Sequence, residues 1–208
     1  MAFASKKAAR LILAAALSAT AALPAEIRFD ARYKGRPGAV TVDAQGIAWQ
    51  DAKHRWRWSY PDIQQLRLGA HSLRVTSGRT YEFIGEVPAG IYPHWKDRLD
   101  QRFVAALADP AVHAGWRIPV RHVTRRTPTE GTIEIGADRI VYAADRPDDS
   151  RTWRYSDIDN ISTSGPFQLT ITTLEKSFNF ELKQVLSEVQ FNELWLQINL
   201  GNRRIQLP

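Results

Sequence analysis

Apolar and polar residues alternate in short runs along residues 27–84 and again along residues 118–182. A period of two places successive side chains on opposite faces of an extended chain, so each run predicts a half-buried β-strand. Glycine, proline, aspartate and serine separate the runs, as they do between strands joined by tight turns. We therefore predict seven strands in each segment. Their ranges are 27–33, 39–43, 47–50, 54–58, 63–68, 73–76 and 80–84, then 118–123, 132–135, 140–143, 152–155, 158–163, 169–172 and 177–182.

After the first set of strands the period lengthens to about 3.6 residues, which predicts an amphipathic helix. Charged residues lie off its apolar face, and Asp109-Pro110 is expected to end it. The apolar stripe comprises Trp95, Leu99, Phe103 and Ala106.

A second helix is predicted after the second set of strands. Ser187 and Gln190 have the spacing of a capping box, in which the two side chains bond free N–H groups of the first turn. Gly201 is a natural stop, because glycine commonly ends helices. The apolar stripe comprises Phe191, Leu194, Trp195 and Ile198.

The two segments repeat one another. The sequence WSYPDI at residues 58–63 returns as WRYSDI at residues 153–158, and the strands and the helix follow in the same order. Because an internal repeat of this kind is one structural unit used twice, we expect two tandem domains. The predicted boundaries are residues 26–109 and 117–201, with a linker at 110–116 and a tail at 202–208.

Seven antiparallel strands followed by one helix in about 90 residues resemble the pleckstrin-homology-like fold. The W-x-Y-x-D-I segment is similar to a strand-opening sequence of bacterial members of that superfamily. The resemblance implies a mainly β protein of two tandem seven-stranded antiparallel barrels or sandwiches, each capped by a C-terminal amphipathic helix. A lipocalin-like or other meander barrel is the alternative, but it would not explain two helices at equivalent positions.

Residues 1–25 have the composition of a secretory signal peptide. A basic start contains Lys6, Lys7 and Arg10, an apolar run extends from residue 11 to about residue 22, and Ala21 or Ala25 precedes the cleavage site. The run is shorter than the roughly 20 residues that a membrane-spanning helix needs. We therefore expect an exported protein, periplasmic or extracellular. The chain has no cysteine, so it forms no disulfide and carries no thiol-linked lipid.

The formal charge of +6 is unevenly distributed. Without the basic residues of the leader it falls to +3, with a net +7 over residues 26–127 and a net −4 over residues 128–208. Three explanations are open: the halves attract each other, the first half faces an anionic partner, or the charges are ordinary solvated side chains.

Basic and aromatic residues interleave in the sequence KHRWRW at residues 53–58. In a strand, His54, Trp56 and Trp58 share one face, while Arg55 and Arg57 share the other. We interpret the aromatic face as core, since Trp58 aligns with a tryptophan of the second repeat. An exported protein of this pattern is not expected to bind nucleic acid.

The sequence offers no constellation for catalysis or metal binding. Asp62 and Asp157 are equivalent turn residues, expected to accept hydrogen bonds from nearby backbone N–H groups. The five histidines lack the short spacing of metal ligands, and no glycine-rich phosphate loop or serine elbow is present. We therefore expect no enzyme activity and no cofactor.

The resemblance nominates basic residues around the loop between the first two strands of each repeat as ligand-binding: Lys34, Arg36, Arg125 and Arg126. The second strands lack the basic residues that lipid-binding members carry, with Thr41 and Glu134 at those places. The expected function is a non-enzymatic binding or scaffolding module that recognises an envelope protein or peptide through a sheet edge or the groove beside a helix. The alternative is peripheral binding to an anionic membrane surface through the basic first half.

Overall fold

The computed structural model describes residues 26–203, apart from residues 89, 97–98, 100–101 and 126. The predicted signal peptide, most of the predicted tail and Arg126 lie outside the described residues. Within the described part of the chain, no helix is both long and apolar enough to cross a membrane.

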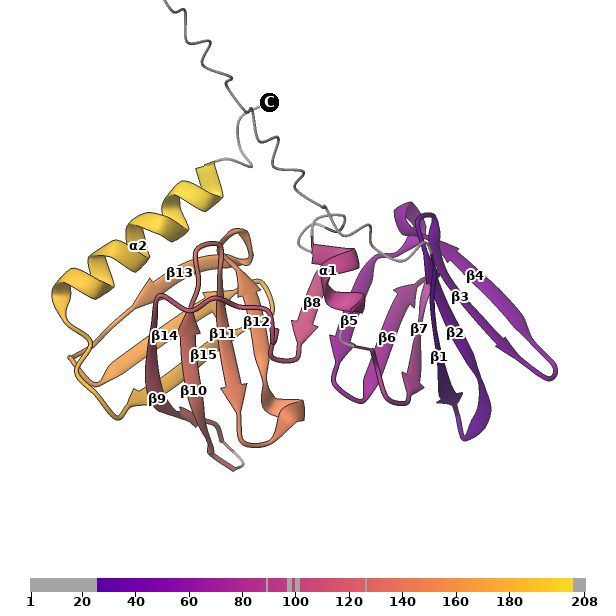
Figure 1. Cartoon of the computed structure of the whole chain (residues 1–208), viewed down its shortest axis with the longest axis horizontal. Helices are drawn as coiled ribbons and strands as arrows, with labels where there is room; N and C mark the ends of the chain where they lie inside the picture. Colours follow the sequence, from indigo (N-terminus) through magenta and orange to yellow (C-terminus); the bar gives the residue numbers. More distant parts are fainter. Residues whose placement is uncertain (1–25, 89, 97–98, 100–101, 126, 204–208) are drawn as a thin grey trace, which may run out of the picture.

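The chain is mainly β with two helices, and its strands form one open mixed sheet of fifteen strands (Figure 1). A strand lies at every position that the alternation predicts. The earlier strands are β1 (Glu26–Tyr33), β2 (Arg36–Asp43), β3 (Gly46–Asp51), β4 (Arg55–Ser59), β5 (Gln65–Gly69), β6 (Ser72–Ser77), β7 (Arg79–Ile84) and β8 (Phe103–Ala106). The later ones are β9 (Trp116–Val123), β10 (Thr129–Ile135), β11 (Arg139–Ala144), β12 (Arg151–Arg154), β13 (Ile158–Ser162), β14 (Gln168–Thr173) and β15 (Ser177–Leu182). The helices are α1 (Ile91–Lys96) and α2 (Glu188–Arg203), and 3₁₀ turns occur at η1 (Tyr60–Asp62), η2 (Pro147–Asp149) and η3 (Tyr155–Asp157).

The order of the strands in space is the same on both sides of β8. The sheet runs β13-β14-β15-β9-β10-β11-β12, then β8, then β5-β6-β7-β1-β2-β3-β4. Neighbours are antiparallel except for the parallel pair of β5 and β8. The motif tryptophans occupy matching places, since Trp58 pairs with Ile47 in β3 and Trp153 pairs with Ile140 in β11. The strands β4 and β12 are therefore counterparts in the repeat.

Strand β8 corrects the prediction of a helix that continues through Phe103 and Ala106. Helix α1 has only six residues, and residues 103–106 form a strand instead. The strand pairs with β5 on one side, where Leu66 faces Phe103, and with β12 on the other, where Thr152 faces Ala105. Backbone partners on both sides outweigh a local 3.6-residue period, because an unpaired buried backbone group is costly.

Helix α2 matches its predicted start but not its predicted end. The Ser187 hydroxyl accepts the Gln190 N–H at 3.2 Å, and the Ser187 N–H donates to the Gln190 side chain at 3.2 Å, which confirms the capping box. Leu194 is buried, whereas Trp195 is 47% exposed and does not belong to the buried stripe. Gly201 lies within the helix, at a point where a Cβ would come 2.9 Å from the Cβ of a neighbouring tyrosine. This glycine allows close packing and does not stop the helix.

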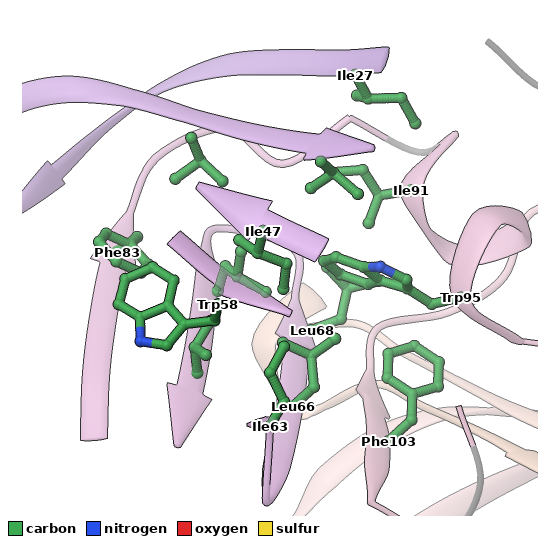
Figure 2. Packing of buried hydrophobic residues seen from close by; sticks show 14 of the residues in the cluster. Ile27, Ile47, Trp58, Ile63, Leu66, Leu68, Phe83, Ile91, Trp95 and Phe103 are labelled. Atoms are coloured by element: carbon green, nitrogen blue, oxygen red, sulfur yellow. The ribbon is translucent and has the colours of Figure 1, made fainter. Parts of the chain in front are cut away.

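Apolar side chains of β1–β8 and α1 form a first core (Figure 2). Trp49 stacks on Phe83 with ring centroids 4.9 Å apart. Figure 2 shows Trp95 reaching from α1 toward Ile47 and Leu68. The short helix therefore fills one end of this core, which explains why six residues suffice to hold it in place.

A second core lies among β9–β15 and α2. Tyr142, Phe178 and Phe180 are buried in it, and the ring of His122 packs among them with centroids 5.0–5.7 Å away. Trp153 is 4% exposed and Trp58 in the first core 7%, so the predicted core face of the motif is confirmed.

Polar contacts join the two cores beside β8. The guanidinium Nη1 of Arg154 donates to the carbonyl oxygens of Lys96 and Leu99, both at 2.5 Å. Arg67 forms an ion pair with Glu175 at 2.5 Å. Side chains of the second half thus hold backbone and side chains of the first, so the halves pack directly and are not linked by a free tether.

Candidate functional site

The predicted basic loop of the first half is a tight turn between β1 and β2. Lys34 has φ 48° and Gly35 has φ 79°, both in the left-handed region that suits such turns. The Lys34 ammonium lies 5.5 Å from the centroid of the Tyr33 ring. Lys34 and Arg32 line a hollow of about 680 Å³ beside the turn, together with Arg74, Thr80, Glu82 and Ile84. A cation is therefore presented at this turn, although an ion pair of Arg74 with Glu82 at 2.8 Å offsets part of the charge.

The other predicted site residues lie apart from this hollow. Arg36 is exposed at the start of β2, opposite Tyr33 in the register. Arg125 is exposed in the loop between β9 and β10, and Arg126 is outside the described residues. No hydrogen bond or ion pair between described residues joins the two loops. A ligand-binding role for Lys34, Arg36, Arg125 and Arg126 stays a prediction.

The equivalent aspartates occupy structural turns. Asp157 accepts the Arg154 backbone N–H at 3.1 Å and also pairs with the Arg154 guanidinium at 2.6 Å. Asp62 accepts a hydrogen bond from the Ser59 hydroxyl. Among the described residues, no group of three histidine or carboxylate side chains could hold a metal ion.

The end strand β4 presents an open, regular backbone edge. The Asp51 N–H donates to the His54 carbonyl at 3.0 Å, and the pairing continues in register to Ser59. Hydrogen-bonded and non-hydrogen-bonded pairs alternate in an antiparallel ladder. Arg55, Arg57 and Ser59 therefore fall in the non-bonded pairs, and their N–H and C=O groups point away from β3. No described strand pairs with that side of β4.

The opposite end of the sheet is less regular. Strand β13 shifts register between Ile158 and Asn160, which marks a bulge. A bulge at an edge interrupts the row of backbone groups and discourages further strand pairing. The two ends of the sheet are therefore unequal, and β4 is the better template for an added strand.

A short loop fixes the position of β4 against β3. The backbone N–H groups of Lys53 and His54 donate to Asp51 Oδ1 at 2.7 and 2.6 Å. The Lys53 N–H, then burial acting in the opposite sense and the bonds from His54, bring the pKa of Asp51 to about 2. The carboxylate thus stays ionised and holds the loop at all but strongly acidic pH.

The side chains of β4 divide between two faces. Trp56 is half-buried and Trp58 is buried on the inner face, while Arg55 and Arg57 are exposed on the outer face. Arg57 Nη2 donates to both carboxylate oxygens of Asp43, at 2.9 and 2.8 Å. Arg55 has no ion pair among the described residues, so its charge is available to a partner.

The outer face of the neighbouring strands carries mainly polar and charged side chains around the small side chain of Ala39. Ala39 in β2 lies between Asp30 in β1 and Gln50 in β3. The same region contains a hollow of about 840 Å³, lined among others by Arg28 and Arg32. Sequence reasoning missed these arginines and Arg55, since each occurs as an ordinary polar member of an alternating strand.

Comparisons with known proteins give no family. No family model and no curated protein matches the chain. Among solved structures, a crystal structure of the C-terminal domain of an unknown protein from Leishmania infantum is 12% identical, covers 41% of this chain and 84% of its own, and has a TM-score of 0.34. The structure of the Spt16D Pob3N heterodimer is 14% identical, covers 72% of this chain and 83% of its own, and has a TM-score of 0.31. At these values neither likeness bears on function.

Proposed function

We propose that the protein is an exported, non-enzymatic binding or scaffolding module of two tandem pleckstrin-homology-like domains, which recognises an extended segment of another cell-envelope protein. The observation that carries the proposal is the difference between the counterpart strands β4 and β12. Strand β12 is covered by β8, whereas no described strand covers β4.

The chain itself supplies a precedent for strand addition at this position. Thr152 in β12, which pairs with Ala105 of β8, is the counterpart of Arg57 in β4. The Arg57 backbone groups point to the open side of β4, because Arg57 and Ala48 form a non-hydrogen-bonded pair in the β3–β4 ladder. Main-chain hydrogen bonds of this kind give affinity to extended peptides, while side-chain contacts give specificity.

Photo-cross-linking in the native envelope tests the proposal. A photoreactive residue at Ser59, on the open edge, is expected to capture a defined partner, and one at Asn160 in β13 is expected not to capture it. The variant Arg55→Pro removes an N–H that faces the edge but leaves the β3–β4 ladder intact, because proline is tolerated where the N–H is unpaired. Arg55→Ala is the matched control that keeps this N–H.

We expect Arg55→Pro to abolish the Ser59 cross-link and Arg55→Ala to retain it at least in part. Equal capture by wild type and Arg55→Pro would refute strand addition at β4. Circular dichroism of both variants checks that the fold is retained.

A second candidate function is peripheral binding to an anionic membrane surface. Arg28, Arg32, Lys34 and Arg36 are all exposed on or beside β1, and each basic residue near such a surface contributes about 1 kcal/mol. Co-sedimentation with anionic and neutral vesicles at low and physiological salt tests it. Membrane binding predicts salt-sensitive sedimentation with anionic vesicles alone, weakened by charge reversal at Lys34 and Arg36.

A further inference from the structure

We infer that the segment recognised at β4 runs antiparallel to it and carries acidic side chains on the face that Arg55 and Arg57 occupy. This inference rests on the proposed function and specifies the chemistry of its partner.

The direction of the added strand follows from the corresponding strand pair in the second half. Strand β8 lies antiparallel to β12, with Ala105 opposite Thr152. Arg57 is 95 residues before Thr152, the same offset that relates Trp58 to Trp153. A strand added in the same way to β4 therefore pairs with Arg57 and runs from Ser59 toward Arg55.

The charge follows from what differs between the two edges. In β12, the Thr152 hydroxyl accepts the Asp109 N–H at 2.9 Å and donates to the Leu107 carbonyl at 2.8 Å. In these bonds an uncharged hydroxyl pairs with uncharged backbone groups of the segment that follows β8. Strand β4 has Arg57 at that position and Arg55 two residues earlier, so the side chains beside the edge are guanidinium groups. Carboxylates opposite such groups stabilise a cross-strand pair, whereas cations destabilise it.

The charge of Arg55 contributes most to the preference for an acidic segment. Arg57 already shares its Nη2 with Asp43, while Arg55 forms no ion pair within the described chain. On the other face, half-buried Trp56 lies at the edge. Because side chains alternate between faces, the segment that places carboxylates near Arg55 places its intervening side chains near Trp56. Apolar residues at those intervening positions gain contact area with the indole.

A second copy of the chain is a poor occupant of this edge. Antiparallel pairing of two β4 strands would set Arg55 and Arg57 of one copy against the same residues of the other. Like charges directly opposite each other destabilise strand pairing. The arginines therefore act against self-association and favour an acidic foreign segment.

Binding of synthetic peptides to the purified protein tests the inference. The probes are three labelled, end-capped seven-residue peptides in which valine alternates with glutamate, threonine or lysine, and the readout is fluorescence anisotropy at physiological salt. We expect the glutamate peptide to bind about tenfold more tightly than the threonine peptide, as cross-strand ion pairs with the two arginines would give. Arg55→Glu should abolish that preference, while Arg28→Glu, the same charge change on β1 away from the edge, should preserve it.

A spin label at the peptide N-terminus tests direction, because an antiparallel strand places it near Ser59 and a parallel one near Arg55. Binding of all three peptides with equal affinity would overturn the inference, and so would a spin label located near Arg55. Either result would leave strand addition itself intact. Equal losses in Arg55→Glu and Arg28→Glu would also overturn it, since they indicate diffuse charge attraction as at an anionic membrane. If no peptide bound, and if the photoreactive residue at Ser59 captured no partner in the otherwise wild-type protein, the proposed function would be refuted as well.

Discussion

Replacing Arg154 by alanine tests whether one side chain of the second half holds the first half in place. Its guanidinium Nη1 donates to the carbonyls of Lys96 and Leu99 at 2.5 Å, and Nη2 and Nε donate to Asp157 at 2.6 and 2.9 Å. The Arg154 side chain is only 16% exposed. Arg154→Ala would leave two carbonyl groups without these bonds and the Asp157 carboxylate without its cation.

The expected loss of stability is about 3–4 kcal/mol. A hydrogen bond to a charged group contributes about 1.5–3 kcal/mol, and removing one partner of a buried ion pair costs about 3–5 kcal/mol. These contributions overlap, and water can reach the vacated carbonyls in part, so they do not simply add. For a chain with roughly this number of ordered residues, the corresponding fall in Tm is about 10 °C.

Urea denaturation followed by tryptophan fluorescence and by far-ultraviolet circular dichroism measures the loss. The control is Arg121→Ala, whose partner Glu181 is 3.4 Å away and whose side chain is 48% exposed. An exposed pair of this kind contributes about 0–1 kcal/mol. If Arg154→Ala were no less stable than Arg121→Ala, the contacts of Arg154 with the first half would not stabilise the protein and our reasoning would be wrong.

Three further predictions concern His122, Gly201 and Trp95. Burial, then nearby cations, lowers the pKa of His122 from 6.5 to about 4, so on acidification the unfolded chain takes up the proton before the folded chain does. The contribution of neutral His122 to the free energy of unfolding should be fully present above about pH 6.5, and stability should fall by about 2–3 kcal/mol as the pH drops toward 4. His122→Phe should remove this pH dependence, measured by urea titrations at several pH values. Gly201→Ala should destabilise by about 1 kcal/mol net, because a Cβ would lie 2.9 Å from a tyrosine Cβ, whereas Gly165→Ala, with no atom within 4 Å of the added Cβ, should be close to neutral in the same assay. Trp95→Ala should cost about 3–5 kcal/mol and Trp195→Ala clearly less, since Trp95 is 0% exposed and Trp195 is 47% exposed.

The strands were predictable because each is buried on one face. In β1, for example, Ile27, Phe29 and Ala31 are buried and the residues between them are exposed. Such alternation is a local signal that depends only on having a core on one side. The sequence therefore contains the strand positions even without knowledge of their partners.

The first helix was mispredicted because two periods overlap in the same residues. Leu99 and Phe103 have helical spacing, yet Phe103 and Ala105 also alternate with partly buried Val104. Which period prevails depends on β5 and β12, which lie far from this segment in the sequence and offer backbone partners on both of its sides. No local pattern contains that information.

The same limit applies to the candidate site. A basic turn such as Lys34-Gly35 is visible in the sequence, whereas the end of a sheet is a property of its whole topology. The motifs around Trp58 and Trp153 share four of six residues, WSYPDI and WRYSDI, so the repeat predicts equivalent strands at the two places. Only the placement of β8 shows that the edge of β12 is covered and the edge of β4 is open.

Four residues, Phe103–Ala106, thus determine both the shape of the molecule and the location of its free edge. By pairing with β5 and β12 together, they join the two sets of seven strands into one sheet and use the edge of the second set that corresponds to β4. A partner that competed for β12 would have to displace β8 and also break the contacts of Arg154 with the first half. A partner at β4 displaces no described strand. Strand addition at β4 therefore costs the least disruption of the fold, and the arginines on its outer face then select among extended segments by charge.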